Sequence, residues 1–584
     1  MTATAHGFDV GSATIPEAAA TMPPTARGEV DRALAELSAN KQRWATLAIA
    51  ERVVLLERLI ATTLAASRRW VDAAIEAKGI RPGSPQEGEE WLGGPMVTIR
   101  NMRLLAQSLR DVQMIGYPRT PGKPYLRADG KVAVPVGPAG FFDRMLFAGF
   151  AAEVWMQPGV NLDDLRLTQA VAYRTKSAGK VALVLAAGNV SSIGPMDALY
   201  KLFAENQVVA LKMNPVNEYL GPIFAEALRP LVERGFLRIV YGGAAAGAYL
   251  CDHELVEEIH ITGSDKTHDA IVFGVGTAGK HNKASRTPIN RKRITSELGN
   301  VSPIIVVPGP WSAKDIAFHG ANLASMLTNN AGFNCNATRV IVQHDGWTQR
   351  GALLDAVRAT LAATPTRKAY YPGASDRYRS FLAAHPDAEQ LGQARDGELP
   401  WMLASGLDPR RADDICFTTE AFCSVTSEVA LAASSVAEYV AAAVRFANET
   451  LWGTLNAGII VHPRSLRDPE VARAVEQGIA DLRAGSVVVN HWPALSYALV
   501  STTWGAFPGH DAYDIRSGSG VVHNTYLFDK AEKSVIRGPF RVFPKPPWFV
   551  TNRQAHAIGQ RMTRFEAAPT VAKLPGVVWA ALRG

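Results

Sequence analysis

The chain has 584 residues, of which 47% are hydrophobic and 20% are charged. This composition is typical of globular proteins, excludes a low-complexity chain and, at this length, favours two or more domains around a large core. The net charge is +7, but residues 530–584 contain ten Lys or Arg against two Glu, so the remainder is almost neutral. The charge therefore gives the main body no basic surface for nucleic acid, and we expect no nucleic-acid partner.

The four cysteines form no C-x-x-C pair, which argues against a disulfide framework and against a metal site. A reducing, cytoplasmic location is the simplest interpretation. No stretch of about 18 uninterrupted apolar residues exists, so we predict no membrane span. Residues 1–25 are rich in Ala, Thr and Pro, with no basic start and no long apolar run. They indicate a disordered lead-in and not a secretion signal.

The next part of the chain is predicted to be helical. Residues 27–115 carry helical patterns, and the segment VVLLERLIATTLAAS at 53–67 is too apolar for a solvated helix. We therefore expect this segment to pack on another element. Strand-like runs follow at 131–142 and 181–186, and a polar connection separates them.

From residue 181, short apolar runs alternate with helical patterns. Such an alternation predicts a parallel sheet with helices on both faces. Asn189, Lys212 and the pair Gly263-Ser264 each lie at or just after the end of an apolar run. Because ligands bind beyond the carboxyl ends of parallel strands, we expect these residues to meet at one edge of the sheet. A second alternating region runs from about 300 to 490.

The segment NNAGFNCNATRV, residues 329–340, places Cys335 among asparagines and a glycine. Asn and Gly form turns, whereas an ordinary structural cysteine lies in an apolar core. The segment is therefore predicted to be a loop that presents a thiol. Three other segments carry further candidate residues: Asn189 in AAGNVSS, Glu297 in SELGNVSP, and Glu420 with Phe422 in TTEAFCSV.

In their order and spacing, these motifs resemble the NAD(P)-dependent aldehyde dehydrogenase superfamily over roughly residues 130–530. The resemblance implies an α/β fold with two parallel-sheet domains and a small oligomerisation hairpin, in a homodimer or homotetramer. We expect six segments: the lead-in 1–25, a Rossmann-like cofactor-binding domain from 26–154 and 181–296, the hairpin at 155–180, a catalytic domain at 297–490, a substrate-pocket and return segment at 491–529, and a basic C-terminal extension at 530–584.

The resemblance also implies a role for each candidate residue. Cys335 would add to an aldehyde, and the side chain of Asn189 with the backbone N–H of Cys335 would stabilise the negative oxygen that develops. After hydride transfer to the nicotinamide, Glu297 would activate the water that hydrolyses the thioester. The expected cofactor contacts are Lys212 at the adenosine ribose, Gly263 and Ser264 at the pyrophosphate, Glu420 at the nicotinamide ribose, and Phe422 lining that pocket.

The chain departs from the family pattern in two places near the expected cofactor. His268 stands where the turn G-S-x-x-x-G would have its last glycine. Pro215 stands where many NAD-preferring members carry a glutamate, so NAD and NADP both stay open. The aromatic residues within 491–510 favour an apolar or aromatic aldehyde as the substrate: Trp492, Tyr497, Trp504 and Phe507.

Three functions are compared. Oxidation of an aldehyde to a carboxylic acid is the main hypothesis. A coenzyme A-acylating aldehyde dehydrogenase, or acyl-CoA reductase, is the alternative, because the sequence around Asn189 is unusual, although Glu297 favours hydrolysis. A non-catalytic binding protein on the same fold is the third, prompted by His268.

Residues 530–584 contain prolines that argue against one long helix. Packing of this extension at a subunit interface is favoured over contact with an anionic membrane surface.

Overall fold

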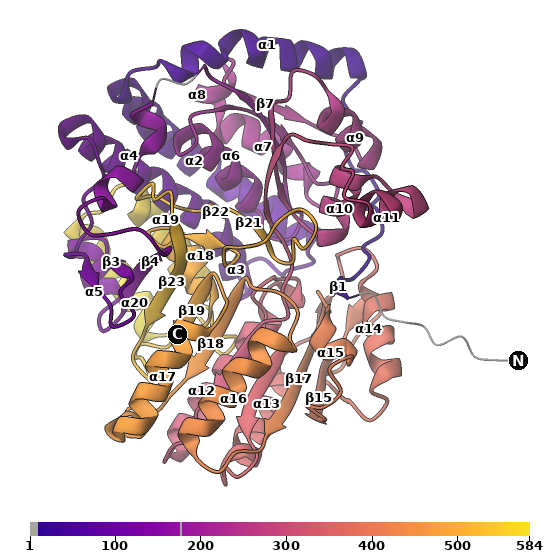
Figure 1. Ribbon diagram of the computed structural model, residues 1–584, viewed down its shortest axis with the longest axis vertical. Helices are drawn as coiled ribbons and strands as arrows, with labels where there is room; N and C mark the ends of the chain where they lie inside the picture. Colours follow the sequence, from indigo (N-terminus) through magenta and orange to yellow (C-terminus); the bar gives the residue numbers. More distant parts are fainter. Residues whose placement is uncertain (1–9, 176–177) are drawn as a thin grey trace, which may run out of the picture.

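The computed structural model describes residues 10–175 and 178–584. Within these residues, two large sheets with helices around them form the two halves of the molecule (Figure 1). The smaller sheet has six strands and the larger has eleven. The expected α/β fold with two parallel-sheet domains is confirmed. None of the described helices is long and apolar enough to cross a membrane.

The smaller sheet contains five parallel strands and one antiparallel edge strand. Its central strands are short and almost entirely buried, as expected where helices cover both faces of a parallel sheet. Strands β5 and β6 are mainly apolar, whereas β8 also buries Glu258, His260 and Thr262. In spatial order the strands are β21 (Gly518–Ser519), β9 (Arg293–Glu297), β8 (Glu258–Thr262), β5 (Val181–Leu185), β6 (Val208–Lys212) and β7 (Leu237–Val240).

Helices connect these strands in the predicted alternation. They are α6 (Ile193–Phe203), η4 (Glu218–Leu220), α7 (Gly221–Ala227), α8 (Arg229–Val232), α9 (Ala244–Asp252), α10 (Asp265–Phe273) and α11 (Gly276–Ala284). All five parallel strands therefore present their carboxyl ends to one edge of the sheet, where such folds bind ligands.

The larger sheet is parallel over seven neighbouring strands and antiparallel at both ends. In spatial order it contains β13 (Glu389–Leu391), β15 (Trp401–Leu407), β17 (Val425–Leu431), β11 (Val340–His344), β10 (Pro303–Val306), β18 (Asn456–Ile460), β19 (Ser486–Val489), β23 (Ala531–Arg537), β4 (Ala151–Met156), β3 (Val132–Gly137) and β2 (Tyr125–Leu126). Its helices are α12 (Ala313–Thr328), α13 (Arg350–Ala363), α14 (Ala374–Ala384), α15 (Ile415–Thr418), α16 (Val436–Glu449), η6 (Ser465–Arg467), α17 (Pro469–Asp481) and α18 (Ala494–Leu499). Short two-stranded pairs are β12 (Arg367–Lys368) with β14 (Glu398–Leu399), and β20 (Trp504–Gly505) with β22 (Val521–Val522).

The antiparallel hairpin is β3–β4, which extends the larger sheet beside β23. The expected positions were wrong in two respects: residues 132–156 do not belong to the smaller sheet, and the hairpin does not lie at 155–180. Of that range, residues 157–175 contain the short turns η2 (Leu165–Thr168) and η3 (Val171–Tyr173), and residues 176–177 lie outside the described part. Residues 132–137 and 151–156 form the two strands of the hairpin because they carry the β-branched and aromatic residues that suit a strand. A role of this hairpin in oligomerisation stays a prediction.

The C-terminal extension packs on the N-terminal helices of the same chain. The N-terminal helices are α1 (Arg27–Ala45), α2 (Ile49–Ala77), α3 (Glu87–Trp91), η1 (Leu92–Met96), α4 (Val97–Ile115) and α5 (Phe141–Leu146), and the extension adds α19 (Ala555–Ala567), η7 (Val571–Lys573) and α20 (Leu574–Leu582). An apolar cluster joins Met96 to α19 and α20. The buried Arg100 of α4 pairs with Asp143 at 2.5 Å and with Glu566 of α19 at 2.8 Å.

Residues 10–25 lie against the body of the molecule, so the expectation of a disordered lead-in is wrong for them; residues 1–9 lie outside the described part. Strand β1 (Gly11–Ser12) pairs in parallel with β16 (Thr419–Glu420). Figure 1 shows β1 at the junction of the two halves, between α10 and α14. The composition of this segment did not reveal the pairing because the pairing depends on backbone hydrogen bonds.

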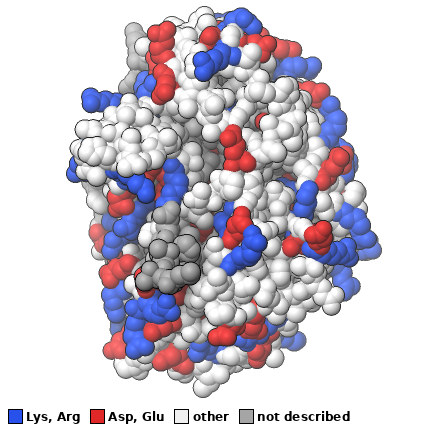
Figure 2. Space-filling view, turned by 90° about the vertical axis from the view of Figure 1, so that its right-hand side faces the viewer, with Lys and Arg blue, Asp and Glu red and all other residues white. Residues whose placement is uncertain are grey.

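On the face shown in Figure 2, basic and acidic side chains are interspersed.

Candidate active site

The loop at residues 329–336, which we call the nucleophile loop, follows α12 and carries Cys335. It begins with three residues in the left-handed backbone region, Asn330, Ala331 and Gly332, with φ of 52°, 56° and 82°. A Cβ on Gly332 would lie 2.5 Å from the carbonyl oxygen of Cys423, so only glycine fits there. These residues turn the chain sharply between the helix and the cysteine, in agreement with the predicted loop.

Buried side chains fix the backbone of the nucleophile loop on both sides of the cysteine. The guanidinium of Arg339 donates hydrogen bonds to the carbonyls of Gly332 at 2.7 Å and Asn334 at 3.3 Å. The carbonyl of Cys335 itself accepts from Ser302 Oγ at 3.0 Å and from Asn456 Nδ2 at 3.1 Å. The position of the thiol is therefore determined by neighbouring strands and not by the loop alone.

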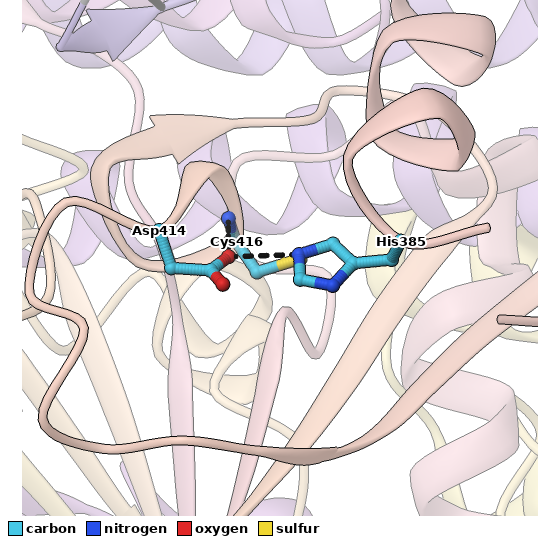
Figure 3. Close-up of side chains that lie close together, drawn as sticks. All are labelled: His385, Asp414 and Cys416. Carbon is cyan, nitrogen blue, oxygen red and sulfur yellow. Dashed lines mark hydrogen bonds and ion pairs between the residues drawn. The ribbon is translucent and has the colours of Figure 1, made fainter. Parts of the chain in front are cut away.

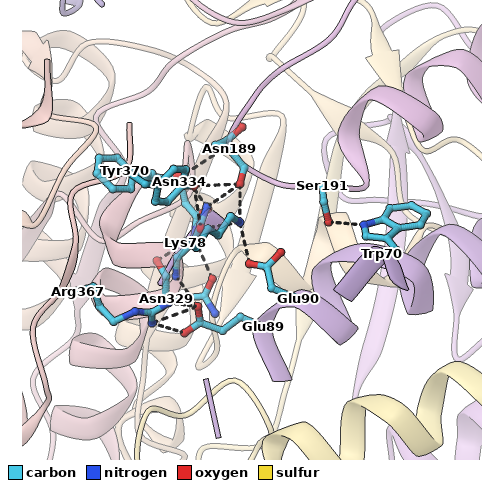
Figure 4. Close-up of polar contacts among 12 residues, drawn as sticks. Trp70, Lys78, Glu89, Glu90, Asn189, Ser191, Asn329, Asn334, Arg367 and Tyr370 are labelled. Carbon is cyan, nitrogen blue, oxygen red and sulfur yellow. Dashed lines mark hydrogen bonds and ion pairs between the residues drawn. The ribbon is translucent and has the colours of Figure 1, made fainter. Parts of the chain in front are cut away.

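A buried ion pair connects the N-terminal helices to this loop (Figure 4). Lys78, at the end of α2, pairs with Glu90 of α3 at 2.7 Å, and both side chains are about 95% buried. The amine of Lys78 also donates to the carbonyl of Asn189 and to Oδ1 of Asn330, each at 3.0 Å. The hydroxyl of Tyr370 donates to the same two oxygens, at 3.1 and 2.9 Å. One cation thus holds together the loop of Asn189 and the nucleophile loop.

The structure brings together the three predicted catalytic residues. Glu297 ends β9, Asn189 lies beyond the end of β5, and Cys335 lies in the nucleophile loop. Cys335 packs in the same apolar cluster as Trp504, whose Nε1 donates to Glu297 Oε1 at 3.2 Å. Asn189 Nδ2 donates to the carbonyl of Phe333 at 2.9 Å. The chemical roles of these residues stay predictions.

Burial dominates the electrostatics of this site. It raises the pKa of Glu297 to about 8, and the nearby charges of Asp197 and Glu420 act in the same direction. The side chain of Cys335 opposes this shift. Burial also raises the pKa of the Cys335 thiol well above its ordinary value, together with the charges of Glu297 and Glu420. Near neutral pH the pair therefore holds its protons, and Glu297 gains its basic form as the pH rises through about 8.

Three of the predicted cofactor residues, Lys212, Gly263 and Ser264, lie at the carboxyl edge of the smaller sheet. Lys212 is the last residue of β6, and Gly263 with Ser264 connect β8 to α10. The Ser264 hydroxyl caps α10 by accepting from the backbone N–H of Thr267 at 3.1 Å. His268 is buried on α10, so the helix forms without the last glycine of the family pattern.

Glu420 lies in β16 and is 3% exposed. Burial raises its pKa to about 7, while the charge of Arg339 opposes the shift. Its Oε1 is buried and has no hydrogen-bond partner among the described residues. Phe422 has φ of 42° and packs edge-on against Tyr371, with the ring centroids 5.0 Å apart. The charge of Glu420 acts on Cys335, and Phe422 lies 6.1 Å from Phe333 of the nucleophile loop, measured between ring centroids. Their contacts with a cofactor stay predictions.

The four aromatic residues predicted to line the substrate pocket differ in their position relative to Cys335. Tyr497 and Trp504 belong to the apolar cluster that contacts Cys335. Trp492 Nε1 donates to the carbonyl of Asn336, next to the cysteine, at 2.8 Å. Phe507 instead lines a cavity of about 640 Å³ together with Val521 of the β20–β22 hairpin. Sequence reasoning did not single out the residues that fix the loops. Lys78 and Glu90 belong to no motif, while Asn330 and Arg339 lie within the segment 329–340 but were not chosen as candidates. Only the turn preference of Asn330 gave a signal.

Among the described residues, one cluster has the composition of a metal site: His385, Asp414 and Cys416 (Figure 3). His385 Nε2 lies 2.9 Å from Asp414 Oδ1, which also accepts from the backbone N–H of Cys416 at 2.9 Å and so caps α15. These two contacts account for the arrangement as an ordinary buried cap, so we assign it no ligand.

The family model for the aldehyde dehydrogenase family matches residues 151–372. The 4-trimethylaminobutyraldehyde dehydrogenases of Bos taurus and Danio rerio are 37% identical over 128 residues and 31% identical over 138 residues. The matched stretch spans only 22% and 24% of these relatives, and the same shares of this chain.

Solved structures match over most of the chain. The TM-score is 0.58 with aldehyde dehydrogenase 21 of Physcomitrella patens in complex with succinate, at 13% identity over 88% of this chain and 91% of that chain. It is also 0.58 with an aldehyde dehydrogenase C mutant of Pseudomonas syringae in complex with NAD⁺ and octanal, at 16% identity over 92% of this chain and 98% of that chain.

Residues 151–372 of the chain are thus similar to the aldehyde dehydrogenase family, and the solved structures share its fold. The match to the family model includes Asn189, Lys212, Glu297 and Cys335, whereas Glu420 lies beyond the matched residues. The residues predicted as nucleophile, base and oxyanion donor therefore all lie within the matched part.

Proposed function

We propose that this aldehyde dehydrogenase homologue oxidises an aldehyde to a carboxylic acid with NAD⁺ or NADP⁺, through a hemithioacetal and a thioester on Cys335. The observation that carries the proposal is the meeting of a thiol, a carboxylate and a side-chain amide from three separate segments. Cys335 packs in the same apolar cluster as Trp504, to which Glu297 is hydrogen-bonded, and Asn189 is hydrogen-bonded to the nucleophile loop.

The first step forms a carbon–sulfur bond. Above a pH of about 8, the Glu297 carboxylate can take the proton of the Cys335 thiol, and the thiolate adds to the carbonyl carbon. The electron pair of the carbonyl bond moves to the oxygen. Asn189 Nδ2 uses one hydrogen for the Phe333 carbonyl and retains a second, which can donate to this oxygen with the backbone N–H of Cys335.

When bound, oxidised nicotinamide supplies the acceptor for the hydride that leaves the former aldehyde carbon. The residues at the sheet edge fit such a cofactor in their chemistry. Glu420 has a buried carboxylate oxygen without a partner, which suits a ribose hydroxyl. Lys212 offers a cation, and the N-terminus of α10 with Gly263 and Ser264 suits a pyrophosphate. Asp265 in the first turn of that helix is the one unfavourable charge.

Hydrolysis of the thioester completes the reaction. Glu297 first releases the proton taken from Cys335 to solvent and then accepts a proton from water, the hydroxide adds to the thioester carbon, and the carbon–sulfur bond breaks to release the acid and the Cys335 thiolate. Trp504 holds Oε1 of Glu297, which orients the carboxylate. Tyr497 and Trp504 beside the cysteine support an apolar or aromatic aldehyde as the substrate.

The test follows the formation of reduced nicotinamide with each cofactor and a panel of aliphatic and aromatic aldehydes. Cys335→Ala should abolish turnover, while Cys416→Ala, which removes another buried thiol, should retain it. Glu297→Gln should release about one reduced nicotinamide per site in a burst and then lose about 10²–10⁴-fold in steady-state rate.

Two outcomes would replace the proposal. Turnover that needs coenzyme A and survives Glu297→Gln would assign the acylating reaction. Cofactor binding without turnover for any aldehyde, with or without coenzyme A, would favour a non-catalytic binding protein.

A further inference from the structure

Residues 10–25, which we call the N-terminal strap, lie along the edge that carries the predicted cofactor residues. The strap begins at β1, where Ser12 is the pairing partner of Glu420. It ends beside β7, where Thr25 and Tyr241 exchange two hydrogen bonds: the Thr25 N–H donates to the Tyr241 carbonyl at 3.2 Å, and the Tyr241 N–H donates to Thr25 Oγ1 at 2.9 Å. The strap thus crosses the sheet from the nicotinamide end of the expected groove to its adenosine end.

At the nicotinamide end, the strap covers both Glu420 and the start of α10. The N–H of Ser12 donates to Asp265 Oδ1 at 2.9 Å, and Lys266 Nζ donates to the carbonyl of Val10 at 2.8 Å. The Ser12 side chain is buried, and it lies with the Glu420 carboxylate against the backbone of Gly299. The side chain proposed to bind a ribose is therefore covered by the chain itself.

At the adenosine end, Glu17 supplies the negative charge that faces Lys212. Burial lowers the pKa of Lys212, and the charge of Glu17 is the largest opposing influence. Glu17 Oε1 also accepts from the N–H of Ala244, the first residue of α9, at 2.7 Å. Further along, Glu218 Oε1 accepts the N–H groups of Thr21 and Met22 at 2.5 and 2.9 Å. A carboxylate of the strap thus lies near the lysine that is expected to meet the cofactor.

We propose that the strap occupies the nucleotide groove and competes with the cofactor, so that the enzyme is autoinhibited until the strap leaves. The inference rests on the proposed function, because that function assigns the groove. The strap and a dinucleotide cannot both contact Glu420, the start of α10 and Lys212. A competitor of this kind weakens the apparent affinity by the fraction of molecules in which the groove is open. If about 1–10% are open, the apparent Kd rises about 10–100-fold.

The strap is built to be displaced at modest cost. Its only strand pairing covers two residues, and its other described bonds are mostly single backbone hydrogen bonds at partly buried positions. Val10 at its start is 58% exposed. Segments with few buried contacts open at much lower free energy than the core.

The test is the affinity of the full-length protein for NAD⁺ and NADP⁺, measured by calorimetry. Gly11 has φ of 112°, and a Cβ there would lie 2.3 Å from Asp265 Oδ2, so Gly11→Val should dislodge β1. We expect about 10–100-fold tighter binding for this variant and for a deletion of residues 2–17. Gly130→Val is the matched control, because Gly130 also has positive φ, at 79°, but nothing lies within 4 Å of its Cβ position. A synthetic peptide of residues 10–25 should compete with the cofactor on the deletion variant.

The outcomes separate the two proposals. Equal affinity for the cofactor in the wild type, Gly11→Val and the deletion would support the proposed cofactor binding. It would contradict the proposal that the strap competes with the cofactor. Weaker binding in both variants would also overturn it, because the strap would then be part of the cofactor site. If no variant binds either nucleotide, the cofactor part of the proposed function fails, and the strap fails with it.

Discussion

The nucleophile loop and the N-terminal strap both lie near Glu420, yet different kinds of interaction hold them. Buried charged groups hold the loop: Lys78 and Arg339 donate to its amide and carbonyl oxygens. The strap is held mainly by a two-residue strand pairing and by backbone hydrogen bonds to the carboxylates of Asp265 and of Glu218, which is buried. Breaking a buried ion pair costs about 3–5 kcal/mol, whereas a hydrogen bond to a charged group contributes about 1.5–3 kcal/mol. The comparison indicates a fixed catalytic centre beside an exchangeable cover.

The largest effect should come from the ion pair beneath the loop. Lys78→Met leaves the buried Glu90 without its partner, so the free energy of unfolding should fall by about 3–5 kcal/mol in a denaturant titration. Adding Glu90→Leu should restore part of that loss, because an apolar pair needs no charge partner. Lys314→Met, at an exposed lysine of α12, is the control and should change stability by less than about 0.5 kcal/mol. Equal stability of Lys78→Met and the control would show that the loop does not depend on this pair.

The second effect concerns the oxyanion. Asn189→Ala removes one donor and should lower kcat by about 10²–10³-fold, with less effect on the binding of the cofactor. Asn161→Ala replaces an exposed asparagine and should leave kcat unchanged. A fall in kcat that is matched by a loss of folded protein in the same sample would assign Asn189 a structural role only.

The third effect is a pH dependence. Since burial raises the pKa of Glu297 to about 8, the basic form is scarce below that pH and predominant above it. At saturating cofactor, kcat/KM for the aldehyde should rise about tenfold per pH unit up to about 8 and then level off. Glu297→Gln should remove this limb of the profile. A limb that persists unchanged in the variant would assign it to another group.

The smallest effect is expected in the strap. Glu17→Gln removes the charge that faces Lys212, and the Kd of the cofactor should fall about two- to fivefold at low salt, since a partly screened pair contributes about 0.2–1 kcal/mol. The difference should shrink at high salt. Glu29→Gln, on the exposed face of α1, serves as the control. A Kd that rises in Glu17→Gln would indicate that Glu17 assists the cofactor.

The sequence predicted the parts of the molecule that local patterns encode. The strands β5 and β6 are short apolar runs, and Asn189, Glu297 and Cys335 were found because each lies in a short motif near such a run. The supporting residues were missed for a physical reason. Lys78 reaches oxygens 111 and 252 positions away, and no local pattern records such a contact.

The strap and the hairpin illustrate two further limits. Composition alone indicated disorder for residues 10–25, but a parallel bridge to β16 requires only backbone groups, which every residue except proline supplies in full. The hairpin was predicted too far along the chain because the family resemblance implied that a hairpin exists but not which residues form it. The β-branched and aromatic content of β3 and β4 was the available local signal.

The pairing of Arg100 with Glu566 has a consequence for biosynthesis. The two residues are 466 positions apart, so α4 is made long before its second carboxylate partner. Until α19 has emerged from the ribosome, Asp143 is the one of these two carboxylates that can pair with the positive charge of Arg100. The apolar residues that α19 and α20 later cover remain exposed to water during that time. The N-terminal helical layer should therefore mature only after α19 has emerged. Products that stop before Glu566 would expose this surface and be recognised by chaperones and proteases.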